Sequence, residues 1–113
     1  MSAVVPPYLG LLYNHIKDRM EIITNRLHKL KSRVDVDQLS YFIEDNMKLI
    51  HELQMYCLEQ VSGVHLWYAS FCNDLKQFYE FHVPLLERLE KQRALFPRNP
   101  CCDRIWQFWK ANA

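Results

Sequence analysis

The sequence predicts an all-α protein, organised as a long antiparallel helical hairpin or coiled-coil-like bundle with one or two short C-terminal helices. Three observations support this fold class. Apolar residues recur at alternating spacings of three and four over most of the chain, which is the heptad pattern of packed helices. Only 2 of the 113 residues are glycine, and no segment shows the strict apolar–polar alternation of a half-buried strand. A chain of this length is typical of one domain, so we expect residues 1–113 to form a single helical domain.

An unbroken heptad seam predicts a first helix over residues 7–33. The seam consists of Leu9, Tyr13, Ile16, Met20, Ile23, Leu27, Leu30 and Val34. Pro6 and Pro7 suit the first turn, where a missing N–H is harmless. Basic residues near the C-terminal end, such as Lys29 and Lys31, favour the helix dipole there.

Residues 34–37 are expected to connect this helix to a second one. Asp35, followed three residues later by Gln38, fits a capping box, and Asp37 is a rival N-cap. The second helix is predicted over residues 36–82 and is about 70 Å long at 1.5 Å per residue. Its main seam repeats every seven residues and consists of Ile43, Ile50, Cys57, Val64, Phe71 and Phe78.

A second line of this long helix alternates between apolar and polar residues. Its apolar members are Leu39, Leu53, Trp67 and Phe81, and its polar members are Asn46, Gln60 and Asp74. Gly63 is expected to cost about 1 kcal/mol in the helix interior without changing the phase of the seam. The sequence therefore predicts one continuous helix across this position.

Pro84 is expected to end or kink the second helix, because proline cannot donate a hydrogen bond to the carbonyl of Glu80. We predict a short helix over residues 84–95, or a bent continuation of the second helix. Pro100 suits the start of a final aromatic helix over residues 100–111. Its apolar residues are Ile105, Trp106, Phe108 and Trp109.

Residues 60–73 contain no formal charge and present apolar side chains around most of the helix. A helix that is apolar all round is buried all round, yet the first helix covers only one side of it. Either the C-terminal aromatic helix folds back as a core lid, or a partner chain covers the second side. We expect partner contacts from the second-helix seam and the C-terminal tryptophans. These predicted partner-binding residues are Ile43, Ile50, Cys57, Val64, Trp67, Phe71, Phe78, Trp106 and Trp109.

Arg19, Arg26 and Arg33 lie seven residues apart beside the first seam, which predicts a charge-pairing role, because such flanking charges select partners in coiled coils. An acidic line on the second helix, Asp45, Glu52 and Glu59, is expected to lie away from that helix's seam. The arginines therefore meet an acidic partner chain or phosphate, or form a solvated face with weak internal pairs.

The sequence offers little chemistry for catalysis or metal binding. It has no Cys-x-x-Cys and no His-x-x-x-His spacing. His65 and Cys72 share one helix face and need a third ligand, such as His82, Cys101 or Cys102, brought in by folding. Small polar residues within apolar faces are more often core packing, so we expect no metal and no cofactor. Without a glycine-rich loop or a polar cluster in an apolar pocket, we also expect no catalytic residues and no enzymatic activity.

These observations predict a non-catalytic helical adaptor or scaffold subunit of an intracellular multiprotein complex. Its expected partner is another helical chain; a hetero-complex is favoured, and a homodimeric four-helix bundle is also compatible with the apolar face of the second helix. The alternative is a basic and aromatic helical module that binds nucleic acid or an anionic membrane surface, which a net charge of +1 does not favour. No secretory signal is visible at the N-terminus and the cysteine spacing suits reduced thiols, so we expect a cytoplasmic or nuclear protein.

Overall fold

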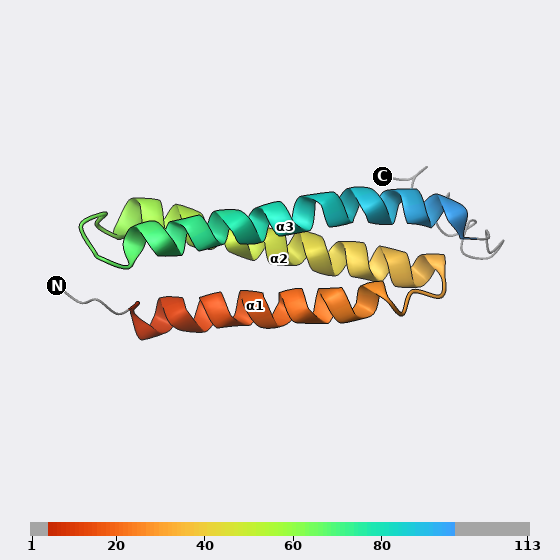
Figure 1. Ribbon diagram of the computed structural model, residues 1–113, viewed down its shortest axis with the longest axis horizontal. Helices are drawn as coiled ribbons and strands as arrows, with labels where there is room; N and C mark the ends of the chain where they lie inside the picture. The colour runs from red at the N-terminus through yellow and green to blue at the C-terminus, as the bar shows by residue number, and fades with distance from the viewer. Residues whose placement is uncertain (1–4, 97–113) are drawn as a thin grey trace, which may run out of the picture.

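The computed structural model describes residues 5–96, and this part of the chain is all-α, as predicted. It contains three helices and no strand: α1 (Pro7–Leu27), α2 (Arg33–Gln60) and α3 (Tyr68–Leu95). Successive helices run in opposite directions, so α1 and α3 point the same way (Figure 1). Both α1 and α3 pack against α2. The predicted aromatic helix over residues 100–111 lies outside the described residues.

The prediction that the first helix extends to residue 33 is wrong, because α1 ends at Leu27 and α2 already begins at Arg33. Ser32 is the N-cap of α2: its Oγ accepts a hydrogen bond from the Asp35 N–H at 3.3 Å. The Asp35 carboxylate in turn accepts from the Lys31 N–H at 2.9 Å. Asp35 therefore completes a reciprocal cap as its third helical residue instead of serving as the N-cap.

The predicted continuous helix over residues 36–82 is also wrong. Helix α2 ends at Gln60, the C-cap residue Val61 is extended, and α3 begins at Tyr68. The apolar phase does continue across the intervening loop, but the Ser62 hydroxyl accepts from the Val64 N–H at 3.4 Å and holds a turn beside Gly63. Folding back at this turn lets α3 cover the face of α2 that α1 leaves open. Burial of that apolar face outweighs the few helical hydrogen bonds lost in the loop.

Pro84 lies inside α3 and does not end it, so the separate helix over residues 84–95 is a continuation of one long helix. Both Pro84 and Glu80 are exposed. The Glu80 carbonyl that loses its helical partner therefore lies on the solvent side of α3, where water can replace the missing donor.

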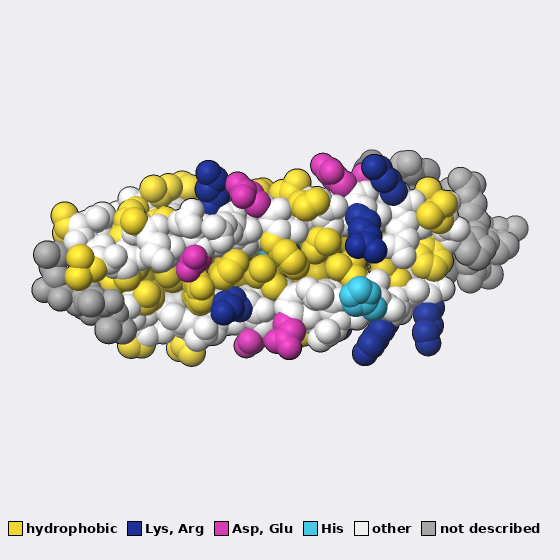
Figure 2. All heavy atoms as spheres, viewed as in Figure 1, with side chains coloured by type: hydrophobic (Ala, Val, Ile, Leu, Met, Phe, Trp, Pro, Cys, Tyr) yellow, Lys and Arg dark blue, Asp and Glu magenta, His cyan; other side chains and the backbone are white. Residues whose placement is uncertain are grey.

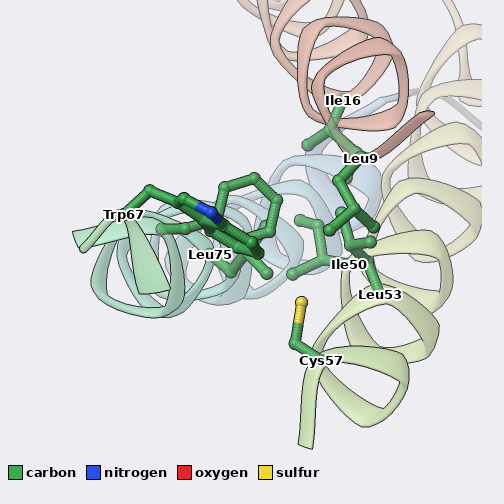
Figure 3. Close-up of a cluster of buried hydrophobic side chains, with 8 residues drawn as sticks. Leu9, Ile16, Ile50, Leu53, Cys57, Trp67 and Leu75 are labelled. Carbon is green, nitrogen blue, oxygen red and sulfur yellow. The ribbon is translucent and has the colours of Figure 1, made fainter. Parts of the chain in front are cut away.

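The core consists of two apolar clusters, one toward each end of the bundle. The cluster nearer the α2–α3 loop, shown in Figure 3, joins side chains from all three helices. Its buried members are Leu9, Ile16, Ile50, Leu53, Cys57, Trp67, Phe71 and Leu75. The second cluster consists of Ile23, Val36, Leu39, Ile43 and Leu89. Leu30 packs on the second cluster from the α1–α2 loop. This residue of the predicted seam therefore contributes to the core although it lies outside the helix.

A buried polar pair separates the two clusters. Asn46 of α2 and His82 of α3 are both inaccessible to solvent. The Phe78 carbonyl, 2.6 Å from Nδ1 of His82, can only accept, so the neutral ring carries its proton on Nδ1 and accepts at Nε2. The Asn46 amide nitrogen donates to that Nε2 at 2.9 Å and to the Ile16 carbonyl of α1 at 3.4 Å. This pair therefore links all three helices at one level of the bundle.

Candidate partner-binding surface

Exposed apolar side chains concentrate at the end of the bundle where α1 begins and α2 joins α3. Among the described residues, seven large apolar side chains are between 63% and 83% exposed. Tyr41 and Leu95 lie in the other half of the bundle. The remaining five belong to the first turns of α1, the last turn of α2 and the loop: Tyr8, Leu11, Leu58, Val64 and Leu66. We call these five residues the apolar tip.

A groove opens between α1 and α3 at the same end of the bundle, and its lining is distinct from the five residues of the apolar tip. The two helices pack on α2 and their backbones do not approach each other closely over the described residues. Long side chains bridge the space, with the Tyr13 ring 5.6 Å from that of Phe71 and 5.1 Å from that of Phe78. Apolar side chains follow the line between α1 and α3 on the face shown in Figure 2. At the tip end the groove has a volume of about 330 Å³, and Val5, Tyr13, Trp67 and Phe71 supply its apolar lining.

One carboxylate gives this apolar groove a polar edge. The Tyr13 hydroxyl donates to Asp74 Oδ2 at 3.1 Å, and both residues line the groove. Burial raises the pKa of the Tyr13 hydroxyl, and the hydrogen bond to Asp74 and its charge raise it further, so this hydroxyl stays protonated at neutral pH. The groove can therefore take an apolar side chain, with a donor or a cation of the same ligand near Asp74.

Trp67 holds the loop against the bundle. Its side chain is buried, stacks on the His65 ring at 5.5 Å and meets the edge of Phe71 at 5.6 Å. Figure 3 shows Trp67 directed into the bundle beside Leu75. The buried Trp67 side chain anchors the loop to the bundle, while Val64 and Leu66 of the same loop stay exposed to solvent.

The predicted partner-binding residues lie in different environments. Ile43, Ile50, Cys57, Trp67 and Phe71 are buried in the chain's own core. Of the others, Val64 is exposed in the loop and Phe78 is half-buried against Tyr13. Trp106 and Trp109 lie outside the described residues. Direct contact of the five core side chains with a partner would therefore require the bundle to open.

Two of the three predicted charge-pairing arginines pack on an aromatic ring of their own chain. The guanidinium carbon of Arg19 lies 4.2 Å from the centre of the Phe42 ring, and that of Arg26 lies 5.2 Å from it. Arg19 also forms a 2.8 Å ion pair with Asp45. Asp45 is exposed and lies away from the buried seam of α2, as expected. Antiparallel packing of α1 on α2 nevertheless brings it beside Arg19, so this arginine has a charge partner on its own chain. Arg33 is the first residue of α2.

The described residues contain no group of three or more His, Cys, Asp or Glu side chains placed to hold a metal ion. Burial raises the pKa of the Cys57 thiol to about 11, and the neighbouring Cys72 adds to this shift. Burial lowers the pKa of His82, although its hydrogen bond to the Phe78 carbonyl opposes the shift. Both groups are therefore uncharged core components at neutral pH. Within residues 5–96, no helix combines the length and apolar character that crossing a bilayer requires.

Sequence reasoning missed most of this surface, although two signals were present. Tyr8 and Leu11 are apolar residues of α1 that fall outside its heptad seam, so they had no core position to fill. Asp74 interrupts the second apolar line, and the structure shows that it faces Tyr13 across the α1–α3 groove. Comparison of the chain with protein-family models, curated proteins and solved structures yields no match.

Proposed function

We propose that this protein is a non-catalytic helical adaptor or scaffold subunit of an intracellular multiprotein complex. It binds a helical segment of another chain at the apolar tip and in the adjoining α1–α3 groove. Two observations at one end of the bundle carry the proposal: five strongly exposed apolar side chains, and a groove of about 330 Å³ between α1 and α3. Scattered exposed apolar residues are normal, whereas a patch of them beside a groove is typical of an interaction site.

The shape of the groove supports a helix as the ligand. Two parallel helices separated by a line of apolar side chains leave the position that a further helix occupies in a four-helix bundle. An amphipathic helix placed there would set an apolar anchor into the groove against Val5, Trp67 and Phe71, and pack further apolar residues on Val64 and Leu66. In this proposal, the coiled-coil-like packing that the heptads predict forms between the partner helix and helices α1 and α3.

The charge distribution favours a protein over nucleic acid or an anionic membrane as the partner. Arg19 and Arg26 pack on Phe42, and the charge on the edge of the groove is the carboxylate of Asp74. A partner helix with a Lys or Arg next to its apolar anchor would complement this edge, whereas a phosphate would be repelled by it.

Site-specific photo-crosslinking in the native cell tests the proposal. A photoreactive phenylalanine analogue replaces Leu66 in the apolar tip or, as a control, Val34 at the opposite end of the bundle, which is also exposed. We expect a discrete protein adduct from position 66 that is absent from position 34. Val64→Glu should abolish the adduct, and Val34→Glu should preserve it, since a charge cannot be buried unpaired in the interface.

The proposal is wrong if position 66 gives no adduct, or if adducts from both positions are equally abundant and insensitive to Val64→Glu. Circular dichroism of the two glutamate variants checks that both remain helical. Because Val64 and Val34 are exposed, neither substitution places a charge in the core.

A further inference from the structure

The turn between α2 and α3 allows two free cysteines, Cys57 and Cys72, to meet. On one continuous helix these residues would lie about 22 Å apart along the axis, at 1.5 Å per residue. In the structure, Cys57 belongs to the last turn of α2 and Cys72 to the first two turns of α3. The two helices are antiparallel neighbours that pack on each other (Figure 1). The distance between the cysteines therefore depends on the register of α2 against α3.

Two contacts away from the loop fix this register. The amide nitrogen of Asn46 lies 2.9 Å from Nε2 of His82. Further from the loop, Nε of Arg93 lies 3.0 Å from Oδ1 of Asp37. From the first contact to the second, α2 is traversed backward by nine residues and α3 forward by eleven, so the register holds to within two residues.

The same register places the two cysteines at one level of the bundle. Cys57 follows Asn46 by eleven residues, and Cys72 precedes His82 by ten. The levels of the two cysteines therefore differ by about one residue, or about 1.5 Å. Eleven residues also make about three full turns, so Cys57 lies on the same side of α2 as Asn46, which contacts α3.

Packing agrees with this placement. Cys57 is fully buried in the cluster near the loop, and Figure 3 shows its sulfur directed into the bundle. Cys72 is half-buried and packs on the same cluster from α3. Burial raises the pKa of the Tyr68 hydroxyl, and the charge of Cys72, a hydrogen bond with Cys72 and the charge of Cys57 raise it further. The two thiols therefore lie close to one phenol, with Cys72 on the solvent side.

We propose that Cys57 and Cys72 are a redox pair that hydrogen peroxide converts to an intrachain disulfide. A disulfide needs Cα atoms roughly 4.4–6.8 Å apart, a separation that facing core positions of packed helices reach. The bond ties the last turn of α2 to the start of α3. It is compatible with the expectation of reduced thiols, because disulfides in reducing compartments are mostly transient. This inference goes beyond the proposed function and does not depend on it.

The accessibility of the two thiols sets the order of the steps. The half-buried Cys72 sulfur attacks one peroxide oxygen: an S–O bond forms, the O–O bond breaks, and the leaving hydroxide takes the thiol proton as water. The Cys57 sulfur then attacks the Cys72 sulfur. The S–S bond forms, the S–O bond breaks, and the second hydroxide leaves as water with the Cys57 proton. Two thiols thus supply the two electrons that reduce one peroxide.

The second step needs no path for peroxide to the buried sulfur. Burial keeps the Cys57 thiol protonated, which makes it slow toward reagents in solution. Its fixed position beside Cys72 offsets this slowness, because an intramolecular attack has a high effective concentration.

Peroxide treatment of the purified full chain, with Cys101→Ser and Cys102→Ser, tests the pair. The native protein is oxidised at neutral pH, and the remaining thiols are then blocked with N-ethylmaleimide. We expect mass spectrometry to find residues 57 and 72 joined within one chain. Dithiothreitol should restore both thiols.

Three variants in the same background provide the controls. Cys57→Ser should leave Cys72 as a sulfenic acid that dimedone traps, and Cys72→Ser should leave Cys57 unoxidised. Tyr56→Cys with Cys57→Ser moves the thiol by one residue to an exposed position of α2, and it should form the disulfide with Cys72 at least several-fold less.

Four outcomes would overturn the proposal: oxidation that stops at Cys72, a disulfide that joins two chains, a disulfide that forms only in urea, or an equal yield from the Tyr56→Cys variant. The principal measurement needs no substitution in the described core, so a folding defect in Cys57→Ser leaves it intact. Circular dichroism before and after oxidation checks that the protein stays helical.

Discussion

Replacing the buried Asn46–His82 pair, one residue at a time and then together, separates the hydrogen-bonding role of these residues from their packing role. His82→Leu removes the acceptor at 2.9 Å from the Asn46 amide nitrogen and leaves that amide with only the 3.4 Å bond to the Ile16 carbonyl. Asn46→Leu leaves Nε2 of His82 without a donor in a site that water does not reach. Each single variant should therefore lose about 1–3 kcal/mol of the free energy of unfolding.

The free energy of unfolding of the double variant should differ from that of the wild type by less than about 1 kcal/mol. Replacing both partners by apolar groups of similar size leaves no buried polar group without a hydrogen bond. The wild type itself already contains one buried acceptor without a hydrogen-bond partner, which is Oδ1 of Asn46. The expected coupling free energy between the two sites is thus at least about 1 kcal/mol. Polar pairs of this kind are better explained by helix register than by net stability.

Urea unfolding followed by circular dichroism measures these values by linear extrapolation, provided that the slope is the same for all four proteins. Asn25→Leu, at an exposed position of α1, controls for the difference in helix propensity between the two residue types. If the single effects sum to the double effect within about 0.5 kcal/mol, the two side chains are not coupled and the reasoning fails.

Two further predictions concern groups in the core. Burial lowers the pKa of His82 in the folded state, so below its ordinary value of 6.5 the unfolded chain binds more protons and stability falls as the pH is lowered. The loss from this group should reach at most about 1.4 kcal/mol per pH unit, with full stability above pH 6.5, and His82→Leu should have a smaller slope in urea unfolding between pH 7.5 and 5.5. Cys57 is fully buried and its pKa is raised to about 11. In a variant with the other three cysteines replaced by serine, Cys57 should therefore react with a thiol reagent at pH 8 only as fast as the protein opens; fast labelling of the native protein would contradict its burial.

Local patterns were sufficient to predict the helical class and the core side of each helix. Leu9, Ile16 and Ile23 were placed on the first seam by their spacing, and all three are buried. Ile43, Ile50 and Cys57 were likewise placed on one line of the second helix, and they form its buried face. This agreement has a simple cause, since the spacing that aligns side chains along a helix depends only on the helix itself.

The position of the α2–α3 turn and the identity of what each seam contacts were decided by tertiary structure. The apolar phase runs through Gly63 without interruption, so periodicity alone could not distinguish one long helix from two that fold back. Five of the positions predicted to meet a partner are buried within the chain's own bundle, because burying apolar surface within the chain requires no second molecule. Similarly, Asn46 and Asp74 appear in the sequence as interruptions, and only packing shows that their partners are His82 and Tyr13. A heptad pattern specifies that a face is buried, whereas the neighbour that buries it is selected by the fold as a whole.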